Sequence, residues 1–203
     1  MNQLTNTAKK LDTFFKVLQI IATIGIVSAL VALAIIGAGF LFDLDPYTIG
    51  TGYNSISLGV LDLEVAEAYA PDEHQVMMVA AAALILSLGF LLVIRSCFHC
   101  VRDILKPMRE GAPFHASVSV NLKKMAKKGI LLFLLANLTK LLSTVIIVFG
   151  FDLPSLLIGE KITHINIHMN LDLTFLVISA ILLLLSYIFH YGEQLQQLSD
   201  ETL

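Results

Sequence analysis

The sequence predicts an all-α membrane protein with four transmembrane helices and a small extracytoplasmic β-sheet formed by the two outer loops. Of the 203 residues, 57% are hydrophobic and 14% are charged, whereas soluble domains carry roughly 25% charged residues. Four long apolar runs follow one another along the chain, and two of their connections alternate apolar and polar residues as strands do. Together these features predict one integral membrane domain over residues 1–203.

The four apolar runs cover residues 17–42, 75–95, 130–149 and 173–189. A bilayer core about 30 Å thick needs about 20 helical residues, so each run is predicted to cross the membrane. The fourth run is the shortest, and tyrosines near its end suit the membrane interface. The first run is longer than the apolar core of a cleaved signal peptide, which predicts an uncleaved first span.

Basic residues are concentrated on one side of these spans. The N-terminal tail holds Lys9, Lys10 and Lys16, and the loop 96–129 with its borders holds most of the other lysines and arginines. The loops 43–72 and 150–172 contain one basic residue, Lys161. The positive-inside rule therefore predicts that both termini and the loop 96–129 are cytoplasmic and that the other two loops lie outside.

Both outer loops contain strand-like alternation. Residues 163–173 alternate strictly, and residues 55–65 alternate in two phases with a slip beside Gly59. Because short isolated strands are unstable in water, we expect the two loops to pair into a sheet over the helix ends.

The cytoplasmic loop contains a break and a basic segment. The second helix is expected to end at Lys106–Pro107, because proline disfavours a helical conformation in the residue before it. Beyond it, Val118, Leu122 and Met125 share one helical face, and four lysines group away from them: Lys123, Lys124, Lys127 and Lys128. This pattern predicts an amphipathic helix on the inner membrane surface, or alternatively a topology signal with no further role.

Lys140 lies in the middle of the third apolar run, and no predicted span offers it a carboxylate. A charged lysine there costs about 2.5 kcal/mol or more, so it needs a partner or loses its proton. The spacing of Asn137, Lys140, Ser143 and Thr144 predicts a polar stripe that faces the helix bundle. The stripe either holds the helices together inside the protein or binds an anion.

Two further groups have metal-like spacing. Cys97, His99 and Cys100 could supply three zinc ligands, but small apolar residues at a helix end are the favoured interpretation. His164 and His168 would stand about 13 Å apart on a strand, which is too far for one zinc ion. No metal and no cofactor is therefore expected.

The sequence contains no pattern typical of an enzyme: HExxH, P-loop and glycine-rich dinucleotide motifs are all absent. The basic segment is predicted to lie against the bilayer, so direct binding of nucleic acid is not expected.

Two segments resemble a known family. The loop from Ile104 to Gly129 and the tail from Ile188 to Leu203 resemble the bacterial membrane family catalogued as domain of unknown function 2975. The matching positions are Gly111, Pro113, Phe114, Asn121, Gly192 and Asp200. The resemblance implies a bacterial inner-membrane location and a small helix-turn-helix regulator as cytoplasmic partner, but no catalytic residues.

Three functions remain open. The first is sensing or regulation, in which the outer β-rich cap receives a signal and the loop 96–129 and the tail pass it to a cytoplasmic partner. The second is a small transporter or immunity-type protein that binds an anionic group at Lys140. A scaffold or assembly subunit is favoured if Lys140 pairs across a homo-oligomer.

Overall fold

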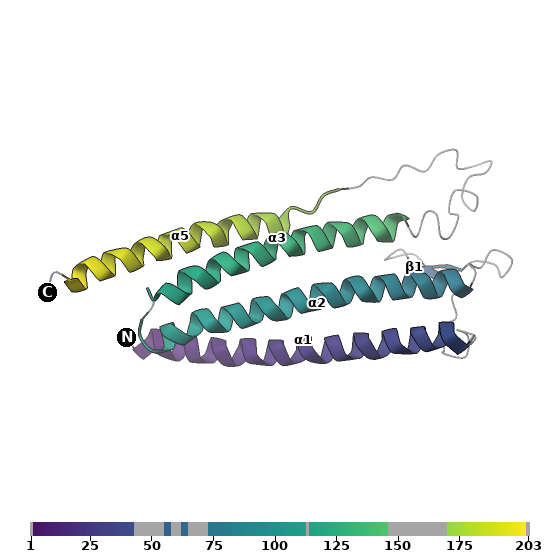
Figure 1. The fold of residues 1–203 in the computed structure, drawn as a ribbon, viewed down its shortest axis with the longest axis horizontal. Helices are drawn as coiled ribbons and strands as arrows, with labels where there is room; N and C mark the ends of the chain where they lie inside the picture. Colours follow the sequence, from purple (N-terminus) through teal and green to yellow (C-terminus); the bar gives the residue numbers. More distant parts are fainter. Residues whose placement is uncertain are drawn as a thin grey trace. The chain divides into compact units, whose positions relative to one another are not determined.

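The computed structural model describes residues 2–42, 55–57, 62–64, 73–112, 114–145 and 170–201. These residues form four helices, α1 (Asn2–Phe42), α2 (Glu73–Arg109), α3 (Ala116–Val145) and α5 (Thr174–Glu201). Two three-residue strands, β1 (Ser55–Ser57) and β2 (Asp62–Glu64), lie between α1 and α2 in the sequence (Figure 1).

Three of these helices are long and apolar enough to cross a membrane. The helical stretches that contain such a segment are Thr5–Phe42 in α1, Met77–Arg109 in α2 and Thr174–Ser199 in α5. The chain is therefore a multi-pass membrane protein. Among the described residues, α3 is not one of these three helices, and residues 146–149 of its predicted span lie outside the described part of the chain.

The chain divides into two compact units. Unit 1 comprises residues 1–27, 88–137 and 171–203, and unit 2 comprises residues 28–87 and 138–170. Unit 1 contains parts of all four helices and most of the polar side-chain contacts described below. In unit 2, the Met77 sulfur lies against Gly39, where it would be 3.3 Å from an added Cβ, so α1 and α2 approach closely there.

The packed centre of unit 1 is formed by α2, α3 and α5. Ile104, Val118 and Leu122 are buried together, and partly buried side chains of α5, including Phe189, pack against them. Val118 is fully buried. The apolar face predicted for the basic segment therefore packs inside the protein, and that segment is the first half of α3 rather than a separate helix on a membrane surface.

Aromatic and small residues join the helices elsewhere in unit 1. The rings of Phe15 on α1 and Phe98 on α2 have centroids 6.0 Å apart. A Cβ added at Gly129 on α3 would overlap the Ser179 hydroxyl of α5. Small side chains let two helix backbones approach closely, so α3 and α5 are in tight contact at this level.

The predicted fold class is wrong, because no sheet joins the two outer loops in the described structure. The fold is helical, and β1 and β2 pair only with each other, antiparallel, with Ile56 opposite Leu63. Both strands come from the first outer loop, so their pairing joins neighbouring segments of the chain and not the two outer loops. The second predicted strand, at 163–173, falls outside the described residues up to position 169, and residues 170–173 are not a strand.

The predicted break at Lys106–Pro107 is also wrong, since α2 continues through Pro107 to Arg109. The helix then ends in a Schellman motif. The amide of Ala112 donates to the Pro107 carbonyl at 2.9 Å, and the amide of Gly111 donates to the Met108 carbonyl at 3.3 Å. Gly111 has a φ of 83°, a left-handed conformation that glycine adopts without steric cost.

Candidate functional site

The connection between α2 and α3 packs onto the end of α5. We call this the loop–tail cluster, and it consists of Phe114, Ser119, Ser186, Phe189 and Gly192. The rings of Phe114 and Phe189 have centroids 5.8 Å apart, and a Cβ added at Gly192 would lie 2.6 Å from the Phe114 ring. The Ser186 hydroxyl donates to the Ser119 carbonyl at 2.8 Å, and both side chains are buried. The loop and the C-terminal helix are thus held as one body.

The start of α3 is fixed by a histidine cap. The Ser117 amide donates to Nδ1 of His115 at 3.1 Å, and the Val118 amide donates to the His115 carbonyl at 2.9 Å. His115 therefore satisfies two of the amides that every helix leaves free at its N-terminus. With the Schellman motif at Gly111, both ends of the short α2–α3 connection are defined.

A cavity of about 200 Å³ lies beside the loop–tail cluster. Its lining residues come from α3 and α5, and they are Ser119, Val120, Lys123, Ser186, Tyr187 and His190. Lys123 is exposed at its edge. The Ser119 and Ser186 hydroxyls already donate to backbone carbonyls, so Lys123 and the Tyr187 hydroxyl are the groups that can donate to a carboxylate or phosphate of a partner molecule.

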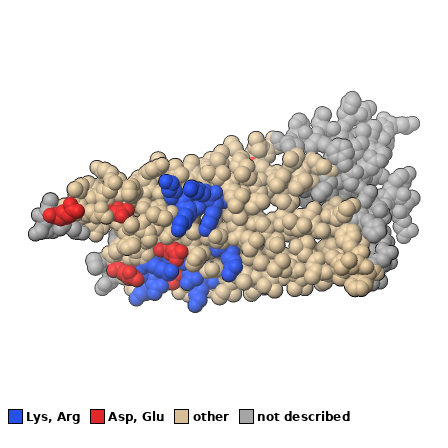
Figure 2. Space-filling model, viewed as in Figure 1, with Lys and Arg blue, Asp and Glu red and all other residues tan. Residues whose placement is uncertain are grey.

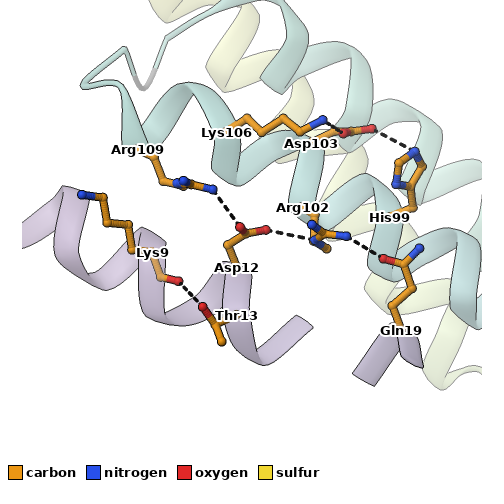
Figure 3. A network of polar contacts seen from close by, with 9 residues as sticks. All are labelled: Lys9, Asp12, Thr13, Gln19, His99, Arg102, Asp103, Lys106 and Arg109. Carbon is orange, nitrogen blue, oxygen red and sulfur yellow. Dashed lines mark hydrogen bonds and ion pairs between the residues drawn. The ribbon is translucent and has the colours of Figure 1, made fainter. Parts of the chain in front are cut away.

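An ionic network joins α1 to α2 (Figure 3). The Arg102 Nε donates to one oxygen of Asp12 at 3.0 Å, and Arg109 donates to the other oxygen at 2.8 Å. A second nitrogen of Arg102 donates to Gln19 at 2.9 Å. The Asp12 side chain is only 16% exposed, so it holds two cations in a partly desolvated place.

Sequence reasoning missed Asp12, because it used the arginines only as topology signals. One signal was available: Asp12 is the only acidic residue among the first 42 residues. A second carboxylate in Figure 3, Asp103, contacts Lys106 at 2.8 Å and His99 at 3.6 Å, and all three are on α2.

A shallow groove of about 420 Å³ lies between α1 and α2 in the same unit. It is lined by Gln19, Leu92, Arg95, Ser96 and His99. The Arg95 and His99 side chains are exposed. The groove has apolar and basic parts side by side, as is common where a helix passes from lipid to water.

The four lysines predicted to form one basic surface separate into two groups. Lys123, Lys124 and Lys127 are exposed. Lys128 is half-buried, and its Nζ donates to the Ser96 carbonyl at 3.1 Å and to the Cys100 sulfur at 3.0 Å. Lys128 therefore joins α3 to α2 inside unit 1.

The Cys–Phe–His–Cys segment lies on α2. Cys97 and Cys100 are free thiols, and no cluster of three potential ligands exists among the described residues. Cys100 is buried beside Lys128, whereas the His99 side chain is 61% exposed. His164 and His168 lie outside the described residues.

The structure describes the side chains of Asn137, Lys140 and Thr144 from the predicted polar stripe. Asn137 belongs to unit 1, where its Nδ2 donates to the Asp172 carbonyl at 3.2 Å and its Oδ1 accepts from the Asp172 amide at 2.9 Å. Lys140 belongs to unit 2 and is exposed, and the Thr144 hydroxyl donates to the Lys140 carbonyl. The side chain of Ser143 lies outside the described residues. Asn137 thus positions the chain that leads into α5.

The residues that carry the family resemblance gather partly in the loop–tail cluster. Phe114 and Gly192 touch one another, Gly111 ends α2, and Asn121 is buried on α3. Pro113 and the side chain of Asp200 lie outside the described residues.

Comparison with protein-family models, with curated proteins and with solved structures found no match. The resemblance to the bacterial membrane family therefore stays a prediction.

Proposed function

We propose that the chain is an integral membrane protein of sensing or regulation that presents its loop–tail cluster to a cytoplasmic partner. The observation that carries this proposal is the contact of Phe114 with Gly192 and Phe189. It joins the loop and the tail, the two segments suggested by the sequence for partner contact, into one surface.

The orientation proposed for this surface is cytoplasmic, in the inner membrane of a bacterium. Apart from Lys140, all described lysines and arginines belong to unit 1. Figure 2 shows those on the visible face gathered on one part of the molecule. The positive-inside rule supports a cytoplasmic position for that part and for both termini.

The chemistry of the surface favours an acidic protein partner. Lys123, Lys124 and Lys127 are exposed on α3, and Lys123 also lines the cavity beside the cluster. A carboxylate of the partner would fit this cavity with charge-assisted hydrogen bonds. The helix-turn-helix regulator implied by the family resemblance is the proposed partner.

The proposal is tested with two glycine-to-alanine substitutions, of which only one places its methyl group against another side chain. Gly192→Ala places a methyl group against the Phe114 ring, whereas Gly37→Ala adds a methyl group with no atom within 4 Å. Transcript levels are compared among strains that carry the wild type, each variant, Phe114→Ala or a deletion of the gene. The amount of protein in the membrane is measured in parallel.

We expect Gly192→Ala and Phe114→Ala to shift the same transcripts as the deletion, at unchanged protein level, while Gly37→Ala matches the wild type. A deletion that changes no transcripts would refute regulation. Lys140→Met separates the alternative function. If it alone abolishes uptake or resistance, and the Phe114 variant does not, the anion-binding reading is correct.

A further inference from the structure

The face of α5 that points away from unit 1 carries a regular apolar seam. Its residues are spaced alternately by three and four positions, and each is between 51% and 63% exposed: Ile181, Leu184, Ile188, Tyr191, Leu195 and Leu198. The opposite face packs inside unit 1 through Ser179, Ser186 and Phe189. In the described part of the chain, the helix therefore has one packed face and a separate exposed apolar face.

Lipid contact explains the first half of the seam but not the second. At 28 residues, α5 is about 42 Å long at 1.5 Å per residue, which exceeds a bilayer core of about 30 Å. Its last part is polar, with exposed glutamines at 194, 196 and 197, and yet Leu195 and Leu198 continue the seam without a change of phase. A narrow apolar stripe on a polar helix is typical of a coiled-coil seam.

The residue types along the seam favour a coiled coil of two parallel helices. In heptad terms, Ile181, Ile188 and Leu195 occupy the a positions, and Leu184, Tyr191 and Leu198 occupy the d positions. Isoleucine at a with leucine at d favours parallel dimers. Two copies inserted in one membrane with the same topology necessarily present α5 in parallel, so the membrane supplies the same orientation.

The flanking positions present no charge that would oppose this pairing. From Tyr187 to Ser199, the e and g positions hold Tyr187, Gly192, Gln194 and Ser199. The acid in this stretch, Glu193, is on the other face, where its side chain is 15% exposed and contacts His190 at 3.3 Å. Between Tyr187 and Ser199, a second copy would therefore meet a self-complementary surface without like charges across it, and the next g position, Glu201, lies beyond the last seam residue.

We infer that two copies of the chain associate in parallel through the α5 seam. The pairing begins in the membrane at Ile181 and continues through Leu198 beyond it. It stands apart from the proposed regulatory role, since it depends on the seam alone. The loop–tail cluster lies next to it, because Phe114 covers Gly192, the residue after Tyr191.

The first experiment uses cysteine crosslinking in native membranes. Leu198→Cys places a thiol in the seam at a d position, where two parallel copies bring Cα atoms within the range of a disulfide, about 4.4–6.8 Å. Gln197→Cys is the matched control, one residue away and outside the seam. The wild type, with its own Cys97 and Cys100, gives the background.

We expect oxidation to give a disulfide-linked product of twice the chain mass with Leu198→Cys and little with Gln197→Cys. Equal crosslinking of both variants, or none, would overturn the inference. A product whose mass includes a different protein would also overturn it, because the seam would then bind another partner.

The second experiment measures the dimer fraction in lipid vesicles by energy transfer between labelled copies. Leu195→Asp should weaken association by at least about a hundredfold, because each dimer loses two buried leucines and gains two facing charges. Gln196→Asp adds the same charge outside the seam and should leave association near the wild-type value. Equal effects of both variants would contradict pairing through the seam. Energy transfer that neither variant changes would show that the copies associate through another surface.

Discussion

The link between α1 and α2 depends on one carboxylate, and Asp12→Asn tests it. The substitution keeps the size of the side chain and removes its charge. The hydrogen bond from Arg102 joins side chains that are 26% and 16% exposed, and its loss should cost about 1.5 kcal/mol. The bond from Arg109 is more exposed, at 40% for the arginine, and should contribute about 0.5 kcal/mol.

The expected total is therefore about 2 kcal/mol. For a chain of this size, 1 kcal/mol corresponds to about 2–4 °C in melting temperature, so Asp12→Asn should lower it by about 4–8 °C. The melting temperature is measured by fluorescence on the purified protein in detergent. Added salt should reduce the difference from the wild type, because it screens the exposed Arg109 bond first.

The matched control is Asp103→Asn. This carboxylate contacts Lys106 and His99, which are neighbours on its own helix. Such contacts contribute about 0.5 kcal/mol, so the control should melt within about 2 °C of the wild type. If Asp12→Asn is no less stable than Asp103→Asn, the reasoning that Asp12 joins two helices is wrong.

Three further substitutions test local contacts by the same melting assay. Asn137→Ala removes both hydrogen bonds to the backbone before α5 and should cost about 2 kcal/mol; a change below about 0.5 kcal/mol would contradict that role. His115→Ala should cost about 1 kcal/mol because α3 loses its cap, whereas His115→Asn should keep most of the stability; equal losses in the two variants would argue against capping. Gly129→Ala should cost about 1–3 kcal/mol because its methyl group overlaps Ser179, and the double variant with Ser179→Gly should recover part of the loss. A double variant no more stable than the single one would place the strain elsewhere.

Helix positions were readable from the sequence because apolar runs have a physical length requirement. The runs at 17–42 and 75–95 lie within α1 and α2, and the run at 173–189 lies within α5 except for its first residue. The helices extend further, since polar residues continue a helix when tertiary contacts hold it, as Asp12 does for the first turns of α1. The run at 130–149 lies in α3 up to Val145, and its last four residues lie outside the described part of the chain.

The sequence did not predict which strands and which helices contact one another. Alternation in the first outer loop predicted strands, but period 2 does not say which strand a segment will meet. Ile56 pairs with Leu63, seven residues away, because closing a short loop costs less chain entropy than joining distant segments. The same limit hid the contact of Asp12 with Arg102, which are 90 residues apart.

The partners of polar residues could not be predicted from the sequence, because one residue type has several uses. Lys128 was grouped with three exposed lysines, although its hydrogen bonds to Ser96 and Cys100 place it between two helices. Asn137 was grouped with Lys140 by spacing, but its amide matches the donor and acceptor of one backbone residue, Asp172. Spacing along one helix does not show what the neighbouring chain presents to it.

The short connection between α2 and α3 has a mechanical consequence. Gly111 ends one helix, His115 begins the next, and Phe114 stands between them on the surface of α5. A connection this short leaves little freedom for α2 to move independently of α3. A tilt or rotation of α2 must therefore be transmitted to α3 and α5 together, or it must first pull the Phe114 ring off Gly192. The contact of Phe114 with Gly192 therefore determines whether α2, α3 and α5 move together or separately.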